Sequence, residues 1–281
     1  MTDLTTTTQR WISRPTPRSE ARLRLFCLPY AGGGMAPFRP WVERLPADIE
    51  LCLVQLPGRE TRMRESPYTV LDDLVDDLVE AIDPLLDRPY ALFGHSMGAW
   101  IGFALARQLR SSGQPEPAHL LVSGRRAPHI PEADAPLHPL PDAAFVAALV
   151  RRYNGIPRAL LEDVELLRLF LPTLRADLTM IETYRFVETP PLDCPITAYG
   201  GWEDGRATQV DLAAWGEVTR GAFELQMFPG GHFFIQTERE ALLATITGAL
   251  ADAASPPAPG RAYLPTDLMK PGAVASARVA D

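Results

Sequence analysis

The chain has 281 residues and a formal net charge of −8, with hydrophobic and charged fractions of 46% and 22%. These fractions are those of an ordinary soluble globular protein, and no apolar run approaches the roughly 18 residues that a membrane-spanning helix needs. The acidic balance argues against nucleic-acid binding, because such binding depends on basic side chains that neutralise phosphates.

The N-terminal residues carry no recognisable targeting signal. They are polar and rich in threonine, and they lack the basic start and apolar centre of a secretory signal. We therefore expect residues 1–21 to form a flexible leader and the protein to be cytoplasmic.

The positions of the cysteines and of the single lysine argue against disulfides, a metal site and a phosphate-binding loop. Cys27, Cys52 and Cys194 lie in or beside strand-like runs without a CxxC pattern or histidine-rich neighbours, so we expect buried structural side chains rather than disulfides or metal ligands. Lys270 is the only lysine, so the glycines at 31–34 lack the lysine that a phosphate-binding loop requires.

Strand-like and helix-like segments alternate along most of the chain. Short apolar runs predict strands at residues 22–28, 50–56, 90–94, 119–124, 195–200 and 223–228. Helical periodicity predicts helices over residues 69–86 and 96–113. This alternation indicates an α/β fold with a mostly parallel central sheet and helices on both faces.

A segment at about residues 127–190 interrupts the alternation with a proline-rich loop followed by helices. Apolar residues of one helical stripe occur at Leu160, Val164, Leu167, Leu171, Leu174, Leu178 and Ile181. Pro172 should kink this helix. The stripe packs against the sheet, or belongs to a lid that also lines an acyl pocket, and the two interpretations are compatible. Residues 251–281 are rich in proline, alanine and glycine, and we expect a disordered tail.

The motif GHSMG at residues 94–98 joins a predicted strand to a predicted helix. In a G-x-S-x-G turn of this kind, the glycines allow a sharp bend that exposes the serine oxygen. Ser96 is therefore the candidate nucleophile, and the alternative is a serine that only caps the helix.

A serine nucleophile needs a histidine to accept its proton. His232 follows the last predicted strand and two glycines, where a loop can carry the imidazole over the serine turn. His95 lies inside that turn, where its side chain should point away from Ser96. The remaining histidines are His119, His129 and His138.

The histidine in turn needs a carboxylate to orient it. The loop after the strand at 195–200 offers Glu203 and Asp204 in a glycine-bounded turn. We favour Asp204, with Glu203 as the alternative, and we expect Asp211 near the start of the next helix.

Acyl transfer also requires N–H donors for the oxyanion of the tetrahedral intermediate. The backbone N–H of Met97 follows from the geometry of the serine turn. A second donor is expected from the glycine-rich loop after the first predicted strand, with Ala31 favoured and Gly32 second. The alternative is that these glycines only shape a tight turn.

Five motifs in order, PYAGGG, VQLPGRETR, GHSMGA, GGWED and GGHFF, make residues 22–250 resemble the type II thioesterases of polyketide synthases and nonribosomal peptide synthetases. The resemblance implies an α/β-hydrolase fold with a helical lid, a triad of Ser96, Asp204 and His232, and oxyanion donors at Met97 and Ala31. One departure is Gly205, where the family commonly has proline after the acid, so Glu203 stays open as the acid.

The resemblance also implies a function and a partner. Proteins of this family hydrolyse acyl groups from the phosphopantetheine arm of acyl or peptidyl carrier proteins, with no cofactor of their own, to clear stalled or mis-primed chains. We expect a monomer. A carboxylesterase or lipase, an acyltransferase and a catalytically dead docking protein are the alternatives.

Carrier proteins are usually acidic, as this chain is, so docking would require a local basic patch. Three groups could supply it: Arg59, Arg62 and Arg64, or Arg125 and Arg126, or Arg151 and Arg152. The alternative for each group is that its members are ordinary solvated surface arginines.

Overall fold

A computed structural model describes residues 6–132, 134–153 and 163–251. In this part of the chain, seven strands form one sheet in the order β1-β3-β2-β4-β5-β6-β7, in which only the β1–β3 pair is antiparallel. The strands are β1 (Ile12–Ser13), β2 (Leu23–Leu28), β3 (Ile49–Val54), β4 (Tyr90–His95), β5 (His119–Ser123), β6 (Ile196–Gly201) and β7 (Phe223–Phe228). The six predicted strands are confirmed to within two residues at each end.

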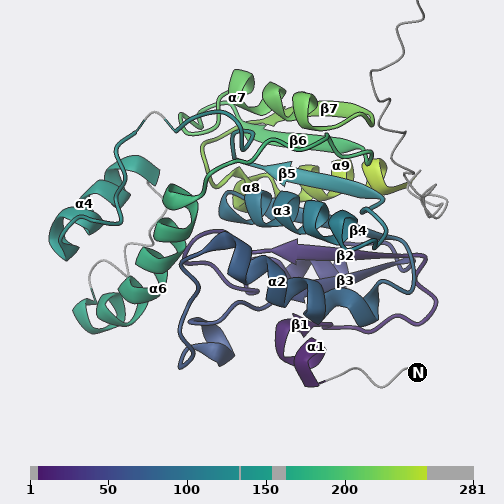
Figure 1. Ribbon diagram of the computed structural model, residues 1–281, viewed down its shortest axis with the longest axis horizontal. Helices are drawn as coiled ribbons and strands as arrows, with labels where there is room; N and C mark the ends of the chain where they lie inside the picture. Colours follow the sequence, from purple (N-terminus) through teal and green to yellow (C-terminus); the bar gives the residue numbers. More distant parts are fainter. Residues whose placement is uncertain (1–5, 133, 154–162, 252–281) are drawn as a thin grey trace, which may run out of the picture.

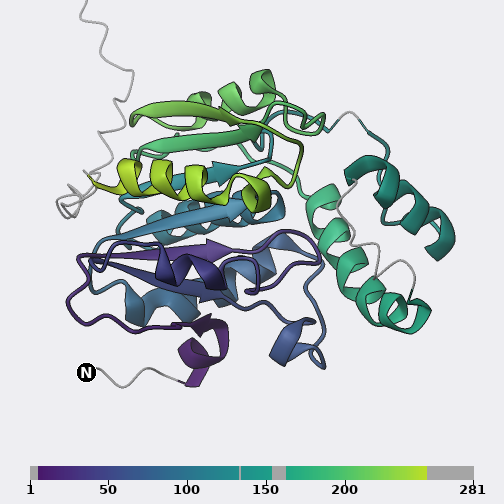
Figure 2. The same cartoon turned by 180° about the vertical axis from the view of Figure 1, so that it is seen from behind.

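Helices cover both faces of the sheet. α2 (Leu71–Ile82) and α3 (Met97–Ser111) lie on one face, and α9 (Arg239–Ala251) lies on the other (Figures 1 and 2). The alternation of side chains in β2 supplies both cores, because Phe26 packs in the cluster under α2 and α3, and Leu25 packs in the cluster under α9. The predicted α/β-hydrolase architecture, a mostly parallel sheet between helices, is therefore confirmed.

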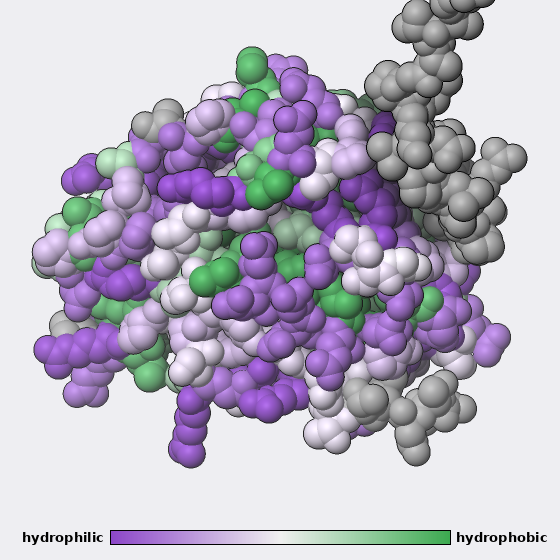
Figure 3. Space-filling view, in the orientation of Figure 1, coloured by the Kyte–Doolittle hydropathy of each residue, from purple (hydrophilic) through white to green (hydrophobic). Residues whose placement is uncertain are grey.

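Shorter elements connect these layers. They are α1 (Thr6–Trp11), α7 (Gln209–Ala213), α8 (Phe234–Thr237), and the 3₁₀ helices η1 (Arg39–Glu43), η2 (Glu60–Arg62), η3 (Asp83–Leu85) and η4 (Ala214–Val218). Hydrophilic side chains cover much of the face shown in Figure 3, and hydrophobic ones lie among them in separate groups. In the described ranges no helix is long and apolar enough to cross a membrane.

The expected flexible leader is wrong from residue 6 onward. Ile12 pairs with Val54 on the outer edge of β3, and the N–H of Gln55 donates to the carbonyl of Trp11 at 2.8 Å. Trp11 is buried, and the guanidinium of Arg62 lies 4.2 Å from the centre of its ring. The segment is ordered because burying these two apolar side chains covers an edge that β3 would otherwise expose. Residues 1–5 lie outside the described part.

The insertion lies at the edge of the sheet where the parallel strands have their carboxyl ends (Figure 1). It contains α4 (Asp142–Tyr153) and α6 (Val164–Thr183), and α6 is continuous through Pro172. In the predicted apolar stripe, Leu171, Leu178 and Ile181 are buried, and Leu167 and Leu174 are half-buried. Leu160 and the side chain of Val164 lie outside the described part, as does the predicted tail from residue 252. That α6 acts as a lid stays a prediction.

The strand order brings the predicted site segments together. β2 lies between β3 and β4, so the loops that follow β2 and β4 are neighbours at the carboxyl ends of the strands. β6 and β7 are also neighbours, and their following loops carry Asp204 and His232. The strand order reverses at β2, because β3 lies on one side of it and β4 on the other. In open α/β sheets, ligands bind at such a reversal, outside the carboxyl ends of the strands.

The three cysteines are free and buried, as predicted. Burial raises the pKa of the Cys52 thiol to about 12, and burial also raises the pKa of Cys27. These thiols are therefore protonated at neutral pH and pack as small apolar groups.

Candidate active site

Ser96 lies at the turn between β4 and α3 in a strained backbone conformation, with φ +52° and ψ −113°. A Cβ atom on Gly94 would overlap the carbonyl of Gly98, and one on Gly98 would overlap the carbonyl of Leu28. The two glycines of the motif are therefore required for the close approach of strand, turn and helix. The Ser96 side chain makes no capping hydrogen bond to α3, so the structure gives no support to a capping role.

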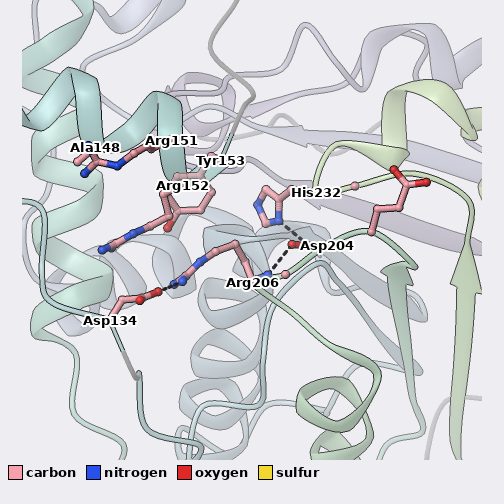
Figure 4. A pocket seen from close by; sticks show the side chains of 11 residues that line it. Asp134, Ala148, Arg151, Arg152, Tyr153, Asp204, Arg206 and His232 are labelled. Atoms are coloured by element: carbon pink, nitrogen blue, oxygen red, sulfur yellow. Dashed lines mark hydrogen bonds and ion pairs between the residues drawn. The ribbon is translucent and has the colours of Figure 1, made fainter.

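The loops after β6 and β7 join Asp204 to His232. Nδ1 of His232 donates to Oδ2 of Asp204 at 2.7 Å, and both side chains are buried. The other carboxylate oxygen, Oδ1, accepts the backbone N–H of Arg206 at 2.9 Å (Figure 4). This arrangement fixes the imidazole with Nδ1 protonated, which leaves Nε2 as its proton acceptor.

The structure also separates the two candidate acids. Glu203 is exposed, and its backbone N–H donates to the carbonyl of Gly230 at 2.9 Å. Asp211 forms a capping box with Thr208 at the start of α7. Of the three carboxylates considered from the sequence, Asp204 is therefore the one that the structure pairs with His232.

His95 links the serine turn to the histidine loop. Its ring centre lies 5.1 Å from that of His232, and its Nδ1 contacts Oγ of Ser123 at 3.0 Å. Burial, followed by the nearby His232, lowers the pKa of His95 well below its ordinary value, so His95 is neutral at physiological pH. A neutral ring beside His232 avoids repulsion when the His232 imidazole becomes charged.

The other histidines have different partners. His119 contacts Oγ1 of Thr197 at 2.8 Å, His129 contacts Glu217 at 3.2 Å, and His138 contacts Glu182 at 2.8 Å. None of these contacts involves the serine turn, so the structure gives no support to these three histidines as the base.

The glycine-rich loop after β2 contains the two candidates for the second oxyanion donor, the N–H groups of Ala31 and Gly32. The N–H of Gly32 donates to Oδ2 of Asp177 at 2.7 Å, so it is already engaged. In the structure as described, no protein acceptor receives the N–H of Ala31. Met97 is the first residue of α3, where N–H groups lack an acceptor within the helix. The geometry thus favours Ala31 over Gly32 as the partner of Met97.

A cavity of about 660 Å³ opens beside His232 and Asp204 (Figure 4). Arg152 and Tyr153, at the end of α4, line its opposite wall, and the ring centre of Tyr153 lies 5.4 Å from that of His232. Arg206 lines the cavity too, and it pairs with Glu132 at 2.6 Å and with Asp134. The cavity can therefore admit a polar group to the imidazole.

Sequence reasoning did not identify Tyr153 or Arg206, and it named Arg152 only as a possible part of a basic patch. Tyr153 and Arg152 belong to the insertion, whose position over the sheet is not visible in the local sequence pattern. Arg206 carried a signal that was available, since it follows Asp204 by two residues in the same turn.

The predicted basic patch for a carrier protein is corrected by the structure. The following arginines of that set are buried: Arg59, Arg62, Arg125 and Arg126. Each is covered because it pairs with an acid or packs on an aromatic ring inside the fold, as when Arg125 lies 3.8 Å from the Trp100 ring centre. Arg64 and Arg151 remain exposed, and Arg152 is half-buried.

Comparison with known proteins gives a consistent result. Residues 23–250 match the family model of the thioesterase domain. The chain is similar to the gramicidin S biosynthesis protein GrsT of Aneurinibacillus migulanus, with 44% identity over 234 residues that cover 83% of this chain and 91% of that protein. It is also similar to RedJ, a thioesterase from the prodiginine pathway in Streptomyces coelicolor, with 41% identity, a TM-score of 0.79, and coverage of 85% of this chain and 94% of that one.

A further relative has a name that denotes a different reaction. Linear gramicidin dehydrogenase LgrE of Brevibacillus parabrevis is 45% identical over 244 residues, which cover 86% of this chain and 92% of that protein. The present sequence contains no G-x-G-x-x-G fingerprint for a dinucleotide, and its G-x-S-x-G turn suits acyl transfer.

The chain belongs to the thioesterase family, and its similarity is to the type II thioesterases of polyketide and nonribosomal peptide pathways.

Proposed function

We propose that this thioesterase hydrolyses acyl groups from the phosphopantetheine arm of acyl or peptidyl carrier proteins, as an editing enzyme of polyketide or nonribosomal peptide biosynthesis. The observation that supports it most is the buried hydrogen bond of 2.7 Å between His232 and Asp204. The imidazole of His232 lies 5.1 Å, ring centre to ring centre, from His95, the residue before Ser96 in the strained turn. The family match over residues 23–250 supports the thioester as substrate.

In the proposed mechanism, Oγ of Ser96 attacks the thioester carbonyl while Nε2 of His232 accepts the hydroxyl proton. Asp204 stabilises the imidazolium through Nδ1. The N–H groups of Met97 and Ala31 donate to the oxyanion, and the pantetheine thiol leaves with the proton from His232.

Hydrolysis then repeats these steps with water. A water molecule gives a proton to His232 and attacks the acyl-enzyme, and the tetrahedral intermediate collapses to release the acid and restore the Ser96 hydroxyl. The cavity beside His232 gives the water access to the imidazole. This chemistry uses no metal ion or redox cofactor. The absence of a cofactor, a monomeric state and a cytoplasmic location stay predictions.

The carrier protein is part of the proposal. Arg151 is exposed and lines the cavity, while Arg152 beside it is half-buried and pairs with Glu182 at 3.8 Å, so Arg151 is the cavity-lining arginine of the set that is best placed to meet an acidic carrier. The buried arginines cannot serve this purpose, because pairing and burial remove them from solvent.

A hydrolysis panel tests the proposal. Carrier proteins loaded with acyl groups of different length and branching are incubated with the enzyme, and the released acid is measured, with Ser96→Ala as the control. We expect release from loaded carriers that exceeds release from matched oxygen esters. Faster turnover of the oxygen esters would indicate a carboxylesterase, and ester or amide formation with added alcohols or amines would indicate an acyltransferase.

A further inference from the structure

A carboxylate from the insertion reaches the loop that carries the proposed oxyanion donor. Asp177 of α6 is 1% exposed, and its Oδ2 accepts the N–H of Gly32 at 2.7 Å. Gly32 has φ +71°, in the left-handed region that favours glycine. The hydrogen bond to Asp177 therefore stabilises the left-handed backbone conformation of Gly32.

Arg59 closes a ring of contacts around the same loop. Its guanidinium donates two hydrogen bonds to Asp177, at 2.8 Å to Oδ2 and 2.7 Å to Oδ1, and a further one at 3.0 Å to the carbonyl of Gly33. Arg59 is itself 3% exposed. A bidentate pair has a fixed geometry, and buried charges are costly to leave unpaired, so the pair and the two glycines hold one another in a single arrangement.

The segment around Arg59 holds the loop at a second point as well. Oε1 of Glu60 accepts the N–H of Ala36 at 3.1 Å, and Glu60 has φ +48°, which is unusual for a residue with a side chain. Residues 59 and 60 thus contact the glycine-rich loop at two points, Gly33 and Ala36, which are three residues apart.

Further contacts seat α6 on these loops. Oγ1 of Thr173 donates to the carbonyl of Gly58 at 2.6 Å, and a Cβ on Gly32 would lie 3.0 Å from Cδ1 of Leu174. Thr173 and Asp177 are four residues apart, so they share one face of the helix. Displacement of α6 would therefore remove the partners of Gly32 and Gly58 together.

We propose that Arg59 and Asp177 are positioning residues for the oxyanion hole, a role that rests on the proposed acyl-transfer function. By engaging the N–H of Gly32 and the carbonyl of Gly33, the pair fixes the adjoining peptide so that the N–H of Ala31 faces the carbonyl oxygen bound at Ser96. The pair also makes the donor depend on the seating of α6, since Asp177 belongs to that helix.

The test separates transition-state stabilisation from simple packing. In Asp177→Asn, which keeps the side-chain volume, we expect kcat for an acyl-N-acetylcysteamine thioester to fall about 10- to 100-fold with KM changed less than about 3-fold, because a misplaced donor acts mainly on the transition state. Affinity for a trifluoromethyl ketone that forms a tetrahedral adduct on Ser96 should fall by the same factor as kcat. Affinity for a non-hydrolysable thioether analogue should stay unchanged.

A matched control comes from the buried pair Arg24–Glu50, in which Nε and Oε2 are 2.9 Å apart. It lies at the amino ends of β2 and β3, away from the serine turn. Glu50→Gln should lower the melting temperature and leave kcat and the ratio of the two inhibitor affinities unchanged, when assayed at a temperature where the variant is folded.

A second variant keeps the proposal testable if Asp177→Asn does not fold. Arg59→Lys retains a buried positive charge but loses the fork, and we expect about a 10-fold lower kcat with the same selective loss of ketone affinity. If either folded variant retains kcat within twofold, or loses both inhibitors equally, the pair only packs α6 and the proposal is overturned. The small thioester and the two inhibitors require no carrier protein. A failure of the enzyme to hydrolyse carrier-bound substrates would therefore count against the proposed function and not against the role of Arg59 and Asp177.

Discussion

The two ends of the central sheet contain the same kind of buried ion pair and use it differently. At the amino ends of the strands, Arg24 and Glu50 are register partners on the neighbouring strands β2 and β3. At the carboxyl ends, Arg59 pairs with Asp177, 118 residues away in the chain, and both contact the backbone of a loop. The first pair ties adjacent strands, and the second ties the insertion to the site.

Backbone strain follows the same division. In the described residues, the non-glycine residues with positive φ angles are Ser96, directly after the carboxyl end of β4, and Glu60, in the loop that follows the carboxyl end of β3. Such conformations persist where the surrounding contacts hold them, and they cluster at functional sites. We therefore expect substitutions at the carboxyl ends to change turnover, and substitutions at the amino ends to change stability alone.

The largest effect is expected for Ser96→Ala. Removing the nucleophile should lower kcat about 10⁴- to 10⁶-fold with no loss of stability, because the side chain makes no capping bond that the fold needs. Single-turnover hydrolysis and thermal unfolding measure the two quantities. Turnover close to that of the unmodified enzyme would remove Ser96 from the mechanism.

Asp204→Asn should have the next largest effect. The amide cannot hold the His232 tautomer with Nδ1 protonated, so we expect kcat to fall about 10³- to 10⁴-fold. Glu203→Gln is the matched control, since this neighbouring carboxylate is exposed, and its kcat should stay within about twofold. The reverse order of effects would make Glu203 the acid.

At the amino ends, Glu50→Gln tests the other half of the comparison. Breaking a buried ion pair costs about 3 kcal/mol, which for a chain of this size lowers the melting temperature by about 6–12 °C. Burial opposes ionisation of Glu50, but hydrogen bonds from Arg24 and Arg14 lower its pKa. The stabilisation should therefore be present above the unfolded-state pKa near 4.5 and be lost as pH falls below it, as denaturant unfolding at several pH values can show.

His119, also at the amino end of a strand, gives the smallest expected effect at neutral pH, because its contribution appears only as the pH falls through about 6.5. Burial lowers its pKa from 6.5 to about 4, so the unfolded state binds a proton that the folded state does not. Between pH 6.5 and 4, this histidine should reduce the free energy of unfolding by about 1.4 kcal/mol per pH unit as pH falls. His119→Asn should remove that slope relative to the unmodified chain. An identical pH dependence in both proteins would contradict the assignment.

The sequence was sufficient for features that depend on local pattern and chain order. The strands, the GHSMG turn and the loops with Asp204 and His232 are all read from short segments, because parallel strands place their following loops at one edge. The sequence favoured Asp204 over Glu203, and the structure adds what local pattern does not show, that the Asp204 side chain turns inward to His232 while Glu203 is exposed.

Other features depend on partners far away in the chain. Arg59 was considered for one of three candidate surface patches, because nothing nearby in the sequence indicates that Asp177 will cover it. The leader was predicted to be flexible because β1 has only two residues, too few to show alternation. In both cases the missing information was tertiary packing rather than local propensity.

The buried cysteines have a practical consequence for observing α6. The native thiols are enclosed and protonated, so a maleimide dye should react slowly with them. Leu169 on the outer side of α6 is 52% exposed, and Leu169→Cys would offer a single accessible attachment point. Fluorescence from a dye at that position could report movement of the helix in a protein whose own cysteines need not be replaced.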